Sequence, residues 1–449
     1  MELTIPNLGE LSVTFRSGFL GAGAAQAWLL MLLMALVGIC VSVGGAAEES
    51  SRQGSRSMSQ ASPQLHIIPA VPKLVWGGLD TYTDDLMISS ALRVCLDFIG
   101  EKHEKWFLAG ASGAAFDLGW AAGTMDAGAG GAVFAHPSHF EPGIENLFRA
   151  IGRNYTVVYG KSDPERLRRV ACESIDAGRP VIASEWRVDH FAVLAGYDAA
   201  SGEFVGRRYG SRKEVPEDYV SIKPDTLAFV IAIGESTSRA SAREAAVGAL
   251  RFAIASARTG TRNTARGQGG TSHAMVYGPE AFTEHARLVP DSLDPNGPDF
   301  DWREHVLRWR LDALQLARAY AIIYLQEVER EFSPSAREHL RVAKGKYYEL
   351  LGLLALDNQT YSAETAFTPL TRLGASEVPM GSPQVRLFGS ADNFWSEDGK
   401  HISIRELLEA SEGRQKFAHW LLKLRDIEEQ AVQALENALA DEAAAVQVR

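Results

Sequence analysis

The sequence predicts an α+β domain followed by an all-α helical region. Between residues 71 and 235, helical patterns at the front are followed by several strand-like runs, an order that predicts an α+β domain. From residue 301 to residue 449, apolar residues recur at three- and four-residue spacing, which predicts helices packed as a bundle. We expect a helix and an irregular connector over residues 236–300. At 449 residues, the chain is long enough for two cores.

The N-terminal segment has the composition of an export signal. Residues 17–47 carry no charged side chain, and an apolar core over residues 27–43 is followed by small residues and then acidic ones. This order predicts a signal peptide over residues 1–47, cleaved near Ala47. The apolar run is also long enough to remain as a membrane anchor. Either route predicts an extracytoplasmic protein. Residues 51–64 are polar and Ser-rich, and we expect a flexible linker over residues 48–70.

The first predicted helix of the α+β domain covers residues 85–99. Asp84 or Asp85 can cap its start, and Gly100 can end it. Its apolar stripe consists of Leu92, Cys95, Leu96 and Ile99. A second helix is predicted over residues 162–178. Four strands are then expected over residues 179–184, 190–198, 202–210 and 226–234.

Three motifs in this domain follow one another in the order of a known family. They are "SSALRVCLDFIG", "LAGASGAAF" and "GRPVIAS…DHFAVLAGYD". On these motifs, residues 76–234 resemble the papain-like C39 group, in particular the N-terminal domain of the butirosin biosynthesis protein H type, a bacterial family. The later motifs "ALRFAIASARTG…GGTSHAMVYGPEAF" and "LRDIEEQAVQALENAL" resemble the helical tail of many such proteins. The resemblance implies a papain-like fold.

The resemblance also implies a catalytic arrangement. A cysteine at a helix N-terminus is activated by a histidine from a strand, and an Asp or Asn orients that histidine. His190 occupies the histidine position. Met87 occupies the nucleophile position, and a thioether has no proton to lose. The orienting acid is missing from the strand after His190, where the chain reads "EFVGRRYG". Asp198 is a substitute, although "GYD" is equally typical of a turn.

The turn "GASGA" is the remaining part of the predicted site. In the resembling family it lines the cleft wall, which implies that Gly110, Ser112, Gly113 and Phe116 bind the ligand. The motif is one residue short of the Gly-x-Ser-x-Gly nucleophile elbow. Such an elbow needs a preceding strand, and the sequence shows none. Ser112 as a nucleophile therefore remains an alternative to Ser112 as part of the pocket wall.

Other side chains favour structural roles. The chain has three cysteines, of which Cys95 and Cys172 lie in helical patterns and are expected to be buried free thiols. His136 and His139 have a spacing seen in metal sites, but no ligand set surrounds them, so no metal or cofactor is predicted. Asp189 should point to the opposite strand face from His190. Glu185 and Arg187 are expected in a solvated turn.

These observations lead to one preferred function and two alternatives. The preferred hypothesis is a pseudo-enzyme that binds a peptide or a small acyl- or amide-bearing ligand. One alternative is an active acyltransferase, amidase or peptidase that uses His190 with a non-cysteine nucleophile or an activated water. The other is an exported scaffold whose helical half binds a partner. A net charge of −11 argues against a nucleic-acid partner. The sequence leaves the ligand, the oligomeric state and the physiological role open.

Overall fold

The computed structural model describes residues 65–72, 75–76, 87–125, 137–185, 188–208, 210–211, 219–266, 272–297, 299–354, 393–395 and 401–447. All of them belong to one compact unit, residues 62–449. The predicted signal segment lies outside the described residues. Within the described residues, no helix has the length and apolar character needed to cross a membrane.

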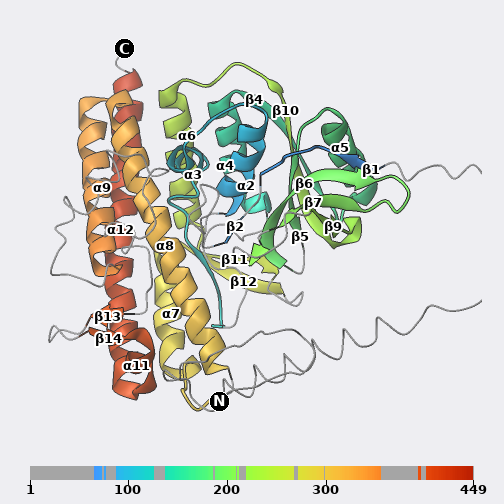
Figure 1. Ribbon diagram of the computed structural model, residues 1–449. Helices are drawn as coiled ribbons and strands as arrows, with labels where there is room; N and C mark the ends of the chain where they lie inside the picture. Colours follow the sequence, from blue (N-terminus) through green and yellow to red (C-terminus); the bar gives the residue numbers. More distant parts are fainter. Residues whose placement is uncertain are drawn as a thin grey trace, which may run out of the picture. The chain divides into compact units, whose positions relative to one another are not determined.

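An antiparallel sheet of seven strands forms the α+β part of this unit (Figure 1). The strand order is β4, β10, β5, β6, β7 and β9, and β1 pairs with the C-terminal end of β6. The strands are β1 (Leu65–Ile67), β4 (Arg153–Tyr159), β5 (Val181–Glu185), β6 (Val188–Asp198), β7 (Phe204–Arg208), β9 (Val220–Ile222) and β10 (Leu227–Ser236). The four strands predicted after residue 178 are confirmed as β5, β6, β7 and β10.

Helices cover both faces of this sheet. Residues 227–233 of β10 are buried in succession, which requires apolar packing on each face. Helix α2 (Met87–Phe98) packs against β5 and β6, α4 (Pro137–Ile151) packs against β4, and α5 (Pro164–Asp176) packs against β4, β6 and β10. In Figure 1, α2 and α5 lie on opposite sides of the sheet.

The two helices predicted in this part are confirmed as α2 and α5. Asp163 caps α5, since its carboxylate accepts a hydrogen bond from the backbone N–H of Arg166 at 3.0 Å. Gly178 follows the helix with φ +73°, a conformation that favours glycine and stops the helix. The proposed caps of α2, Asp84 and Asp85, lie outside the described residues.

The folded part begins earlier than predicted, because β1 lies within the expected linker. The backbone N–H of Ile68 donates to the carbonyl of Ala195 at 2.7 Å. The ring of His66 stacks on Tyr197 at a centroid distance of 4.7 Å. A three-residue strand has no periodicity to reveal it, and its order here comes from contacts with β6.

A second sheet joins the predicted α+β domain to the segment expected to be an irregular connector. Its order is β11 (Thr261–Arg266), β12 (Ser272–Tyr277) and β3 (Gly119–Ala121). The same connector also contains α7 (Pro279–Ser292). Pairing between β3 and β12 links segments more than 150 residues apart, a contact that local sequence patterns do not report.

The C-terminal region is helical, as predicted. Its main helices are α6 (Ala242–Ala257), α8 (Phe300–Val328), α9 (Pro334–Leu354), α11 (Ile404–Glu409) and α12 (Ser411–Gln447). Helix α6 begins with a capping box in which Ser241 and Glu244 satisfy each other's backbone N–H groups. Helix α12 packs against α6, α7, α9 and α11. One continuous apolar core runs through the sheet and these helices.

Short elements complete the described part. They are α3 (Lys105–Ala111), the 3₁₀ helices η2 (Pro224–Thr226) and η4 (Glu329–Glu331), the hairpin of β13 (Asn393–Trp395) and β14 (His401–Ser403), and the parallel pair of β2 (Val75–Trp76) and β8 (Gly210–Ser211).

Candidate functional site

His190 lies in a bulge at the beginning of β6. Strands β5 and β6 form a hairpin in which Ser184 pairs with Phe191, but the next residue of β5, Glu185, pairs with Val188. Asp189 and His190 are therefore extra residues on β6 with no opposite residue on β5. Bulges redirect side chains and are over-represented beside active sites. The prediction that Asp189 and His190 point to opposite faces of the strand relied on regular alternation of side chains, which does not hold in a bulge.

Helix α2 begins at Met87 and packs against the strands of this hairpin. The first N–H groups of a helix have no partner within it, and the helix dipole makes this end attractive to anions and carbonyl oxygens. The backbone thus combines the two elements that the predicted site requires, a helix start and the histidine strand. The side chains of Met87 and His190 lie outside the described part of the structure.

Two serines follow Met87 in the first turn of α2. Ser89 and Ser90 are both buried, 1% and 0% exposed. Residues three apart share a helix face, whereas residues two apart do not. Ser90 therefore lies on the face of Met87, one turn deeper, and Ser89 faces elsewhere. The Oγ of Ser89 is buried and has no hydrogen-bond partner among the described residues.

Glu185 is a carboxylate beside the bulge that the sequence interpretation missed. It was expected in a solvated turn, but it is only 6% exposed. Its Oε1 accepts a hydrogen bond from Oγ1 of Thr226 at 3.1 Å, next to its strand partner Leu227. The prediction was wrong because the turn is shorter than assumed, so that Glu185 still belongs to β5. An acidic residue five positions before the histidine, at the end of a hairpin strand, was the available signal.

Asp198 lies at the opposite end of β6 from His190. Eight residues of extended strand separate their backbones by about 26 Å. The Asp198 carboxylate accepts hydrogen bonds from the N–H of Ala200 and the hydroxyl of Ser201, both at 2.8 Å. These bonds lower the pKa of Asp198, the backbone bond from Ala200 most strongly. Asp198 therefore stabilises a turn, and its position does not suit the orienting role that the sequence allowed.

The "GASGA" turn is packed between helices. Gly110 belongs to α3, and a Cβ there would meet the Tyr324 ring of α8 at 2.1 Å. Gly113 has φ +77°, and a Cβ there would meet Phe252 of α6 at 2.3 Å. Phe116 is 3% exposed. The turn thus packs between α6 and α8. Ligand binding by its residues remains a prediction.

Ser112 follows a helix, so it does not form a nucleophile elbow. That elbow needs a strand before the serine, whereas α3 ends at Ala111. Ser112 is 6% exposed, and its Oγ donates to the Ala109 carbonyl at 3.1 Å. The same Oγ accepts from the backbone N–H of Ala114 at 3.3 Å. The hydroxyl is used in closing the turn.

The described cysteines are free thiols, as predicted. Cys95 is fully buried, and its burial raises its pKa far above that of an ordinary thiol. Cys172 is half-buried, and desolvation also raises its pKa. Nucleophilic cysteines need the opposite shift. Neither thiol therefore has the properties of a nucleophilic cysteine.

Within the described residues, no group of three or more His, Cys, Asp or Glu side chains forms a metal-binding cluster. His136 lies outside these residues. His139 lies in the first turn of α4, and its side chain is not described. No protein-family model and no curated protein matches the chain.

Proposed function

We propose that residues 71–235 form a papain-like domain of the butirosin biosynthesis protein H type that has lost its nucleophile and binds a peptide or amide-bearing ligand. The observation that supports this most directly is the packing of α2, which begins at Met87, against the strand whose bulge contains His190. A methionine at that helix start cannot attack a carbonyl. The dipole of a helix start can still attract a carbonyl oxygen or an anion.

In this proposal, Glu185 and not Asp198 is the acid that orients His190. It is the buried carboxylate beside the His190 bulge, whereas Asp198 closes a distant turn. A buried carboxylate next to a histidine favours the imidazolium form and fixes the ring orientation.

Restoring a thiol at Met87 tests the proposal. In a full-length background with Cys40→Ser, Cys95→Ala and Cys172→Ser, Met87→Cys introduces the single thiol. Its alkylation rate is measured between about pH 5 and pH 10. We expect half-maximal reactivity at least about one pH unit below that of an ordinary thiol, because the helix start and His190 stabilise the thiolate. Adding His190→Ala or Glu185→Gln should move the profile back towards about pH 8.5.

The same background supplies matched controls. Ile88→Cys places a thiol one residue further along α2 on another helix face, where we expect a pH profile that does not change with His190→Ala. Asp198→Asn should leave the Met87→Cys profile unchanged, because its carboxylate bonds only its own turn among the described residues. If the thiol of correctly folded Met87→Cys reacts like that of Ile88→Cys and ignores His190→Ala, the proposed site is wrong.

The buried Ser90 hydroxyl favours the alternative, an acyltransferase or amidase with a non-cysteine nucleophile. It lies on the Met87 face of α2, one turn from the helix start. Turnover of acyl-thioester or peptide substrates that Ser90→Ala and His190→Ala both abolish would support this alternative. Absence of turnover from a broad substrate panel would leave the binding function as the better account.

Export of the chain is part of the proposal. The uncharged segment over residues 17–47 supports it. Cell fractionation together with N-terminal sequencing of the mature protein separates cleavage near Ala47 from retention as a membrane anchor. A full-length chain found in the cytoplasm would contradict both routes.

A further inference from the structure

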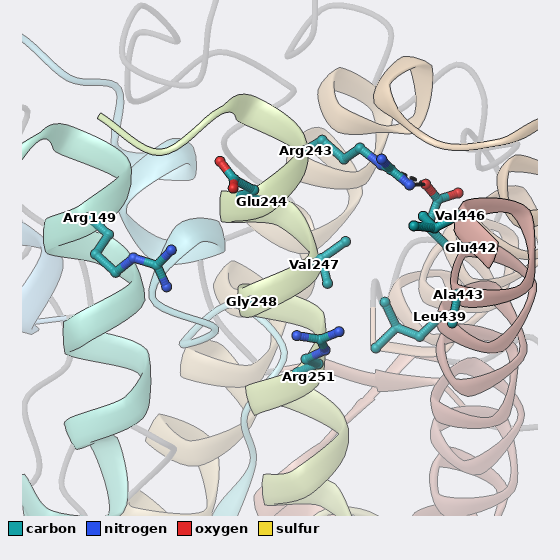
Figure 2. A pocket seen from close by; sticks show the side chains of 10 residues that line it. All are labelled: Arg149, Arg243, Glu244, Val247, Gly248, Arg251, Leu439, Glu442, Ala443 and Val446. Atoms are coloured by element: carbon teal, nitrogen blue, oxygen red, sulfur yellow. Dashed lines mark hydrogen bonds and ion pairs between the residues drawn. The ribbon is translucent and has the colours of Figure 1, made fainter. Parts of the chain in front are cut away.

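A groove of about 380 Å³ lies between α4, α6 and α12, away from the α2 and β6 site (Figure 2). Its volume is in the range of small-molecule binding sites. Arginines from α4 and α6 and apolar side chains from α6 and α12 line it. None of its lining residues belongs to the site proposed above.

Two of its arginines form no ion pair with a described residue. Arg243 forms an ion pair with Glu442 across the groove, which neutralises both groups. Arg149 and Arg251 make no hydrogen bond or ion pair through their guanidinium groups with any described residue. Figure 2 shows Arg149 reaching from α4 towards α6, where Arg251 lies. In a chain of net charge −11, two unmatched guanidinium groups beside one groove favour an anionic ligand.

Glu244 is the remaining acidic group of the lining. Its Oε2 accepts hydrogen bonds from the N–H and the hydroxyl of Ser241 at 2.9 and 2.8 Å, so it serves the start of α6. It lies close enough to Arg149 for an electrostatic interaction, without forming an ion pair with it. Apart from the Arg243–Glu442 pair, the groove therefore has two positive charges, on Arg149 and Arg251, and one negative charge, on Glu244.

One side of the groove is apolar. Val247 lies one turn from both Arg243 and Arg251, so these three residues share one face of α6. Leu439 and Val446 of α12 face them, and Val446 is 52% exposed. Figure 2 shows Val247 and Leu439 pointing into the space between the two helices. Covering this exposed valine with an apolar ligand group would remove apolar surface from water, which is favourable.

The spacing of α4 and α6 is fixed independently of any ligand. A Cβ on Gly248 would meet the amide oxygen of Asn146 at 1.9 Å, so the glycine permits close approach. The buried amide of Asn146 donates to the carbonyls of Ala111 and Ala245, both at 2.8 Å. These bonds hold α3, α4 and α6 together. The groove wall is thus preformed, which lowers the ordering cost of binding.

We propose that this groove binds a small amphipathic anion, a phosphate or carboxylate attached to a short alkyl chain. Arg149 and Arg251 hold the anionic group, and Val247, Leu439 and Val446 cover the chain. The volume favours a free molecule over the headgroup of a bilayer lipid. This inference goes beyond the proposed function and does not depend on it.

Calorimetric titration of the full-length protein with octyl phosphate tests the proposal. We expect octyl phosphate to bind, butyl phosphate to bind more weakly by roughly twofold or more per methylene removed, and inorganic phosphate and octanol each to bind far more weakly. The double variant Arg149→Gln with Arg251→Gln should weaken octyl phosphate binding by roughly tenfold or more.

A charge-matched control is the double variant Arg330→Gln with Arg341→Gln, at exposed positions near α9. It changes the net charge equally and should alter the affinity less than about twofold. Three results would overturn the proposal: no binding of octyl phosphate, equal losses in both double variants, or binding to phosphatidic acid vesicles but not to monomeric octyl phosphate. Because the Met87→Cys experiment uses other residues, each proposal can fail alone.

Discussion

Arg318 of α8 and Glu428 of α12 form a two-point ion pair in the core. Arg318 Nε lies 2.9 Å from Glu428 Oε2, and Nη2 lies 2.8 Å from Oε1. The side chains are 0% and 1% exposed. Arg318 Nη1 also donates to the Ala115 carbonyl at 2.8 Å. The pair therefore connects two helices of the C-terminal region to the turn that follows α3.

Breaking this pair should destabilise the whole unit. Glu428→Gln removes the carboxylate that pairs directly with a buried guanidinium, a change that costs about 3–5 kcal/mol in the free energy of unfolding. Chemical denaturation measures it. The control Glu436→Gln removes one carboxylate from the exposed Arg258 bridge and should cost less than about 1 kcal/mol. Equal losses in the two variants would show that the buried pair contributes no more than a surface bridge.

His285 should make stability depend on pH. It is fully buried and packs against the Trp120 ring at a tilt, and Arg310 Nη1 lies 2.8 Å from its Nε2. Desolvation, then the Arg310 charge, lowers its pKa well below its usual value of 6.5. Below that value the unfolded chain binds a proton that the folded state does not. The free energy of unfolding therefore decreases as the pH is lowered below about 6.5, by up to about 1.4 kcal/mol per pH unit.

The variant His285→Gln isolates this contribution. It removes the titrating ring, so the stability difference between about pH 6.5 and pH 5 should become smaller than in the original chain. Denaturant midpoints of both proteins at the two pH values give the comparison. An unchanged difference would mean that other groups cause the acid sensitivity.

Gly110 and Gly345 should respond oppositely to alanine. A Cβ at Gly110 would strike the Tyr324 ring at 2.1 Å, whereas a Cβ at Gly345 of α9 has nothing within 4 Å. We expect Gly110→Ala to cost about 1–3 kcal/mol through overpacking. Gly345→Ala should gain about 0.5–1 kcal/mol from helix propensity. Thermal unfolding checks both, and a neutral Gly110→Ala would show that α3 and α8 can separate freely.

The native thiols should react slowly. Cys95 is fully buried, and Cys172 is half-buried with a raised pKa. Alkylation of the folded protein followed by peptide mass spectrometry should label Cys172 slowly and Cys95 only after unfolding. Rapid labelling of Cys95 in the folded protein would contradict its place in the core.

Local sequence patterns were sufficient for the elements that depend on local physics. The 3.6-residue repeats predicted α2, α5 and the long C-terminal helices, because apolar residues at this spacing fall on one face of a helix. Alternating β-branched runs predicted β5, β6, β7 and β10. Burial of Cys95 followed from its position on the apolar stripe of α2. The absence of a thiol at Met87 is a property of the sequence alone.

Tertiary structure decided which residues meet. The bulge at His190 depends on the register between β5 and β6, and the burial of Glu185 depends on the length of their turn. The packing of Gly110 and Gly113 depends on α6 and α8, more than 130 residues away. These features come from pairings between distant segments, whose free energy is gained only when both surfaces are in place. The sequence therefore determined the elements and the methionine at position 87, and the fold determined the strand register around His190.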